Sequence, residues 1–172
     1  MATNLQFIKS VTPTGASSSI SITDVFSASY NVYVVNYNWV TDSGSPKDLD
    51  LRFINSSDTI VTNSNYDYAY LQMYVASSFS EVKAENQDKI TAMLSAVDYP
   101  PEGNAGTFTV YNPFATSYTF LTSQSSNSWN GTRASWKGIA VLKEETSITG
   151  FNMFISSTNP TSDSNISVYG VK

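Results

Sequence analysis

Hydrophobic and polar residues alternate with a period of two along most of the chain. Each alternating run is bounded by clusters of Gly, Pro, Ser, Asn or Asp, a pattern typical of strands separated by turns. The pattern predicts strands over residues 5–11, 18–25, 30–40, 49–54, 68–75, 89–97, 107–111, 117–122, 133–143, 147–156 and 164–171. Roughly ten short strands without a sustained helical period predict an all-β protein: an antiparallel, jelly-roll-like β-sandwich that forms a single domain over residues 1–172.

One segment departs from this pattern. Residues 79–83 belong to the only stretch with appreciable charge density, and Phe79, Glu81, Val82 and Lys83 are compatible with one helical turn before the strand at 89–97. The sequence leaves a helical turn and a non-helical segment equally open here.

A tyrosine stripe marks the strand that begins near residue 66. Tyr66, Tyr68, Tyr70 and Tyr74 share one face of this strand, opposite the apolar residues at 69, 71, 73 and 75. Tyrosine buries its ring while its hydroxyl stays at a wet edge, which suits a subunit interface. The stripe therefore predicts a subunit contact, with the inner core as the alternative.

The last nine residues, SNISVYGVK, are unusually strand-like for the end of a chain. Ile166 and Val168 occupy one face of this segment, and Tyr169 and Val171 occupy the other. We therefore expect a paired inner strand, whose second face meets a neighbouring sheet or subunit through Tyr169 and Val171.

Composition narrows the classes of function. The 172 residues include no histidine and no cysteine, which excludes imidazole bases, thiolate nucleophiles and the commonest transition-metal sites. The net charge of −5 and the low charged fraction of 13% favour neither nucleic acid nor an anionic membrane as a partner. The N-terminal segment lacks the apolar run of a secretion signal, so we expect the mature chain to begin near Met1.

Paired carboxylates are the remaining route to catalysis without histidine. The candidates are Asp48 with Asp50, Asp98 with Glu102, and Glu144 with Glu145. All three pairs stand at strand ends or turns, where solvated acids are common, and no calcium loop of EF-hand spacing occurs. We predict no enzyme activity, no catalytic residue, no metal and no cofactor.

Exposed aromatic residues are a further lead. Trp129 stands in the polar segment SSNSWNGTR, where Asn127, Trp129, Asn130 and Arg133 form a candidate ligand platform for a sugar. Packing of Trp129 over a strand end is the favoured alternative. Trp39 and Trp136 lie in alternating strands and are predicted to be core residues.

The order of motifs in the second half of the chain adds a family resemblance. GNAGTFTVYNP at 103–113 is followed by an aromatic strand, the turn WNGTR at 129–133, the segment GIAVLKEETSITGFNMFISS and the terminal SNISVYGVK. This order, with LRFINSSDTIVTNSNYDYAY in the first half, resembles small β-rich virion proteins of tailed bacteriophages over roughly residues 49–172. The chain lacks the glycines that those proteins have where SSTNPTSDSNIS stands.

The resemblance implies a structural role in a virion, made in the host cytoplasm. It favours a capsid decoration (cement) protein that binds the major capsid protein or other virion proteins as a homo-oligomer such as a trimer. The alternative that it implies is a tail-fibre tip, or another module that binds a receptor or carbohydrate.

Overall fold

The computed structural model describes residues 4–15, 17–42, 47–76, 79–94, 96–97, 104–129 and 132–172. These residues form twelve strands and no helix. The strands are β1 (Leu5–Val11), β2 (Ser19–Ile22), β3 (Val32–Trp39), β4 (Lys47–Asn55), β5 (Tyr66–Tyr74), β6 (Phe79–Gln87), β7 (Ala96–Val97), β8 (Asn104–Tyr111), β9 (Thr119–Trp129), β10 (Thr132–Leu142), β11 (Ile148–Ile155) and β12 (Asn165–Val171).

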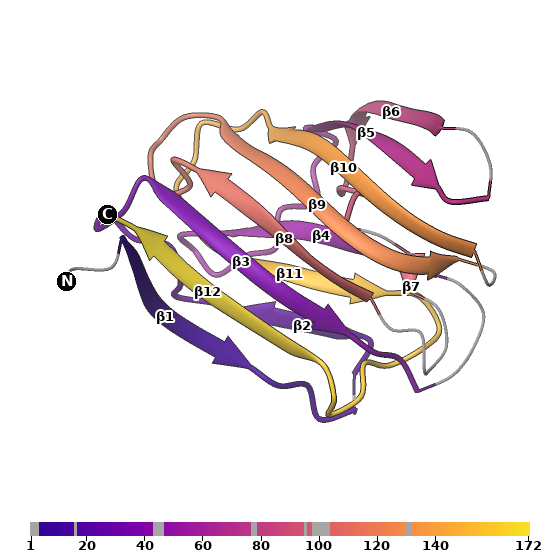
Figure 1. Cartoon of the computed structure of the whole chain (residues 1–172). Coiled ribbons are helices and arrows are strands. Elements are labelled where there is room, and N and C mark those ends of the chain that lie inside the picture. Colours follow the sequence, from indigo (N-terminus) through magenta and orange to yellow (C-terminus); the bar gives the residue numbers. More distant parts are fainter. Residues whose placement is uncertain are drawn as a thin grey trace.

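The strands form two antiparallel sheets packed face to face, so the predicted β-sandwich is confirmed (Figure 1). The large sheet has the order β1-β12-β3-β8-β9-β10-β5-β6, and the small sheet has the order β2-β11-β4-β7. Pairing is antiparallel throughout both sheets.

Eight of these strands have jelly-roll connectivity. The four strands β1-β12-β3-β8 face β2-β11-β4-β7; except between β4 and β7, each strand of this set is followed by one in the other sheet, and the first strand lies beside the last. The remaining strands are additions: β5 and β6 follow β4, and β9 and β10 follow β8. The additions meet through the β10–β5 pairing and lengthen the large sheet; we call β9, β10, β5 and β6 the extension.

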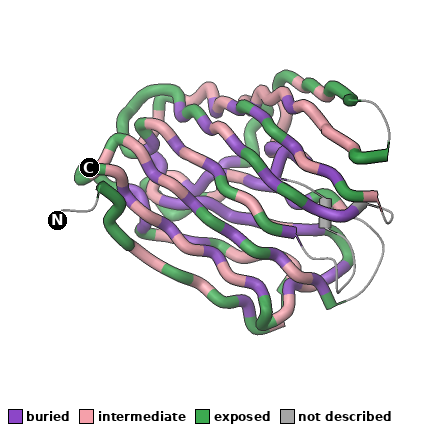
Figure 2. The backbone as a smooth tube through the Cα atoms, in the orientation of Figure 1, coloured by how far each residue is buried: buried purple, intermediate pink, exposed green. Residues whose placement is uncertain are grey.

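A single cluster of buried apolar side chains fills the space between the sheets. Alternate residues of each strand point into it, and buried and less buried positions alternate along the strands (Figure 2). Its largest fully buried side chains include Trp39 and Trp136, as predicted from their place in alternating strands. Burial of each large apolar side chain stabilises the fold by roughly 1.5–3 kcal/mol.

The segment between β6 and β7 covers the inner face of the extension. Leu51 and Ile90 exchange two backbone hydrogen bonds of 2.9 Å, which fix this segment beside β4. Met93 is fully buried, and a Cβ built on Gly138 of β10 would lie 2.5 Å from Met93 Cγ. Glycine at 138 therefore allows the covering segment to approach the extension closely.

Residues 79–83, for which the sequence left a helical turn and a non-helical segment open, form part of β6, because they pair with β5. Two local predictions were wrong. The strand expected over 89–97 is reduced to the short β7 among the described residues. Strand β9 continues past the predicted end at residue 122 to Trp129. The predicted strand was too short because the residues that point into the core there, Ser123, Ser125 and Asn127, are polar.

The terminal segment is the paired inner strand that its pattern predicted. Strand β12 lies between β1 and β3, with Ile166 and Val168 buried against the core. Lys172 N–H donates to the carbonyl of Asn4 over 2.9 Å, so the pairing with β1 persists to the last residue.

Candidate interaction surface

The outer face of the large sheet, opposite the core, is apolar across nearly its whole width. The strand registers align its residues in two neighbouring rows. One row is Leu5, Val171, Val32, Tyr111, Phe120 and Val141; the other is Phe7, Tyr169, Val34, Thr109, Thr122, Ile139 and Ala69. We call these thirteen residues the apolar band. Because neighbouring strands lie about 4.8 Å apart, the longer row spans roughly 30 Å.

None of the residues in the apolar band is buried by the rest of the described chain. The most exposed are Leu5 at 49%, Phe7 at 54%, Phe120 at 52% and Ile139 at 62%. Phe7 and Tyr169 contact each other edge to face, with ring centroids 5.8 Å apart. The next row of the face, with Asn36, Thr107, Gln124 and Lys137, is polar, so the band has a defined border.

The apolar band is hollowed where it crosses the extension. Two adjoining hollows of about 560 and 390 Å³ share Ala69, Lys83, Thr122 and Ile139. The charged residues Glu81, Lys83, Glu85 and Lys137 line them. This end of the band therefore combines an apolar floor with charged walls of both signs.

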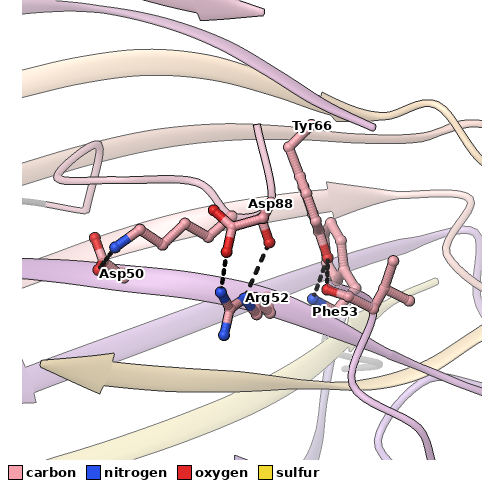
Figure 3. Close-up of polar contacts among 7 residues, drawn as sticks. Asp50, Arg52, Phe53, Tyr66 and Asp88 are labelled. Carbon is pink, nitrogen blue, oxygen red and sulfur yellow. Dashed lines mark hydrogen bonds and ion pairs between the residues drawn. The ribbon is translucent and has the colours of Figure 1, made fainter. Parts of the chain in front are cut away.

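The tyrosine stripe lies on the opposite, inner face of the extension. Tyr66 and Tyr70 are buried in the core, so these two side chains cannot supply a subunit contact without unfolding. The Tyr66 hydroxyl accepts from Phe53 N–H at 2.9 Å and donates to the Val61 carbonyl at 3.1 Å, and burial raises the pKa of this hydroxyl (Figure 3). Tyr68 and Tyr74 are half-buried.

Tyr169 and Val171 lie in the apolar band, half-exposed and facing away from the core. The subunit contact predicted for Tyr68, Tyr74, Tyr169 and Val171 stays a prediction. The sequence analysis missed Phe120 and Ile139, the most exposed apolar side chains of β9 and β10. The signal for Ile139 was the uninterrupted run IAVL at 139–142, which is apolar on both faces of one strand.

The candidate ligand platform is described only in part. Asn127 and Arg133 border two further hollows of about 330 and 430 Å³ at the ends of β8, β9 and β10. Arg133 Nη1 donates to Ser128 Oγ over 3.3 Å. The side chain of Trp129, and the whole of Asn130, lie outside the described residues, so their place in the platform stays a prediction.

The hollow of about 330 Å³ is bordered by polar residues from four strands. One of them, Asn104, is 2% exposed, and neither polar atom of its carboxamide has a hydrogen-bond partner among the described residues. Asn104 lies between Trp39 and Asn127 in one row of the large sheet. A buried amide without partners is costly, so this end of the sheet suits a bound water or a polar ligand.

Of the Asp48 and Asp50 pair, Asp48 is exposed as the sequence suggested, whereas Asp50 is buried. Asp50 is 5% exposed and its Oδ2 lies 2.6 Å from Lys89 Nζ (Figure 3). Burial raises the pKa of both carboxyls, and Lys89 opposes that increase. Arg52 pairs with Asp88 close by, and its guanidinium stacks over Phe154 at 4.9 Å. The carboxylate of Asp50 is therefore part of an ion-pair network that joins β4 to the segment after β6.

The other candidate acids are accounted for differently. Glu144 Oε1 accepts from the amides of Asn63 at 2.8 Å and Asn65 at 3.0 Å, so it fixes the loop before β5. Asp98 and Glu102 lie outside the described residues. Within the part of the chain that the structure describes, no group of three or more acidic side chains is placed to hold a metal ion. A membrane-spanning helix is likewise not found among these residues.

No protein-family model matches the chain, and no match was found among curated proteins or solved structures. The fold and its surfaces are therefore the basis for the function proposed below.

Proposed function

We propose that the protein is a structural component of a bacteriophage virion, a capsid decoration protein that binds the assembled shell and reinforces it. The observation that carries the proposal is the apolar band, which crosses seven strands without cover from the described chain. Contiguous exposed apolar surface of this kind marks sites of protein association. The jelly-roll order of the strands adds support, because this fold recurs in viral capsid proteins.

The proposed mechanism is preferential binding. A protein that binds assembled capsid subunits but not separated ones shifts the equilibrium towards the shell. Each site contributes about 2.7 kcal/mol when the free protein is at 100 times its dissociation constant. Symmetry multiplies this contribution over the copies of the site. The proposal therefore needs a docking surface, which the apolar band supplies, and needs no catalytic group.

The test is to mix the purified protein with capsids that lack it and to image the particles by electron cryomicroscopy. We expect density at regular lattice positions on the shell. Density at the tail alone, or none on the shell, would overturn the proposal.

Two variants test the role of the band. Ile139→Ser combined with Phe120→Ser removes exposed apolar surface without opening the core, and we expect shell affinity to fall at least about tenfold, since each exchange removes a large apolar contact. Gln124→Ser is the matched control on the same face of β9, in the polar row beyond the band, and should bind as the unmodified protein does. Undiminished binding by the double variant would show that another surface docks.

A second candidate function is supported by the polar hollow at Asn104, Asn127 and Arg133. Amides, hydroxyls and a guanidinium around one hollow suit a carbohydrate ligand, as the tip of a tail fibre would require. A glycan array probed with the protein and with Arg133→Ala distinguishes the two functions. Binding that depends on Arg133, without binding to shells, favours the fibre tip.

A further inference from the structure

The exposed edges of the two sheets differ in how they are protected. Unpaired edge strands invite pairing with other chains, and proteins commonly block them with bulges, charges or short length. Among the described strands, β7 has two residues and β2 has four, so neither offers a long edge. Strand β1 is interrupted by a register shift between Phe7 and Lys9, where Lys9 Nζ donates to the Thr23 carbonyl at 2.9 Å.

Strand β6 is the long, regular edge. It ends the large sheet, and within the described structure its only partner strand is β5 (Figure 1). The pairing with β5 runs without a shift from Phe79 to Ala84, and the register shift comes only near Tyr66, at the far end of β6. The strand contains no proline, so each residue whose backbone groups point away from β5 can offer an N–H as well as a carbonyl.

We propose that β6 pairs antiparallel with β6 of a second copy of this chain about a two-fold axis at Val82. The two large sheets then form one continuous sheet of sixteen strands, twice the eight of each copy. The argument for a second copy, and against a strand from another protein, comes from the charges of β6 itself.

The charges of β6 distinguish the register with its axis at Val82 from the two neighbouring registers. In an antiparallel pair, residues that face each other have their side chains on the same side of the sheet. When the two strands are identical and related by a two-fold axis, this condition requires one residue to lie on the axis, facing its own copy. An axis at Glu81 places Glu81 opposite its own copy, and an axis at Lys83 does the same for Lys83. An axis at Val82 places Glu81 opposite Lys83 of the second copy, twice.

The same register suits the other side of β6. Val82 meets its own copy on the axis, and Ser80 faces Ala84 of the second copy, so small or apolar residues meet on the inner side. This register pairs residues 80–84, all within the regular part of the strand. An axis at Ala84 would also bring Lys83 opposite Glu85, but it would carry the pairing into the irregular end of β6 beyond Ala84. Opposite charges across strands are stabilising and like charges are destabilising, so the axis at Val82 is favoured over its neighbours.

The pairing also extends the candidate interaction surface. Glu81, Val82 and Lys83 line the larger hollow of the apolar band. The two-fold axis therefore has the larger hollow of one copy on one side and that of the second copy on the other. Two copies therefore present one surface with two-fold symmetry. This inference does not depend on the proposed virion function, because it concerns only the self-association of the chain.

The first test is a charge exchange followed by light scattering over a range of concentrations. We expect a dimer for the unmodified protein, and a dimer weaker by at least about tenfold for Glu81→Lys or Lys83→Glu, since each change creates two like-charge pairs. The double variant Glu81→Lys with Lys83→Glu restores opposite charges and should restore the dimer. Gln124→Glu, which adds a negative charge on the same face but three strands inside the edge, is the control and should leave the dimer intact.

The second test uses the absence of cysteine from the sequence. A single Val82→Cys should form an intermolecular disulfide on mild oxidation, because facing residues of antiparallel strands have Cα atoms about 4.5–5.5 Å apart. Ala84→Cys is the matched control, since its copy would be four residues away along the strand, roughly 13 Å.

Three results would overturn the proposal. The first is a monomer at every concentration, whether or not a strand from another protein is found to occupy the edge. The second is a dimer that the single charge changes do not weaken. The third is cross-linking of Ala84→Cys in preference to Val82→Cys.

Discussion

Burial of the charged Asp50 side chain costs free energy, and its surroundings offset part of that cost. Its carboxylate is removed from water, which raises its pKa, and Lys89 supplies the compensating charge at 2.6 Å. A buried charge that loses its partner is far more destabilising than the pair is stabilising. The network therefore predicts an asymmetric response to substitution.

We expect Lys89→Met to lower the free energy of unfolding by about 2 kcal/mol at pH 7, because Asp50 would remain charged and buried without its partner. In the folded variant, Asp50 then takes up a proton at a pH above the ordinary pKa of aspartate, whereas in the unfolded chain it does not. The loss should shrink as the pH falls from 7 towards 4, because protonation removes the uncompensated charge.

Urea unfolding at several pH values measures this dependence. Lys137→Met removes a lysine that is exposed on the outer face of β10 and should change stability little at any pH. A loss for Lys89→Met that stays constant from pH 7 to pH 4 would contradict the role given to Asp50.

Whole strands could be predicted where one face of the strand is clearly apolar. The alternation in 30–40, 133–143 and 164–171 located β3, β10 and β12, because each alternates buried apolar residues with more exposed ones. The same rule failed for β6 and for the end of β9. Strand β6 is an edge strand whose charges hide the alternation, and β9 buries serine and asparagine where the pattern expects apolar residues.

The candidate surface was harder to predict than the fold. The tyrosine stripe was correctly placed on one face, but only the covering segment with Met93 decides that this face is internal. The apolar band is assembled from seven strands, of which only β8, β9 and β10 are consecutive in the chain. Its rows depend on strand order and register, and neither can be obtained from periodicity along one chain.

Strand β12 gives a prediction at this scale. Deletion of residues 164–172 removes the only strand that joins β1 to β3 among the described residues and exposes both. We expect the truncated chain to lose its cooperative unfolding transition, as followed by tryptophan fluorescence, because Ile166 and Val168 are core residues. A truncated chain with a normal transition would contradict the inner position of this strand.

At the scale of the molecule, the connectivity joins residues from opposite ends of the chain. Leu5 faces Val171, and β1, β12, β3 and β8 place early and late strands side by side. Folds dominated by such distant pairings fold slowly, because the chain must close large loops before the pairings form.

We therefore expect refolding from urea over milliseconds to seconds, measured by stopped-flow tryptophan fluorescence. Dilution to different protein concentrations separates the folding of one chain, whose rate is independent of concentration, from later association through β6. Complete refolding within microseconds would contradict this expectation.

The place of β1 beside β12 also has a consequence for synthesis on the ribosome. Within the described structure β12 is the only strand that β1 pairs with, and it is made after all the other described strands. The first strand must therefore wait, unpaired, through the translation of nearly all the residues that follow it. The interruption at Phe7 and Lys9, which protects this edge in the finished protein, would also protect the nascent chain during that interval.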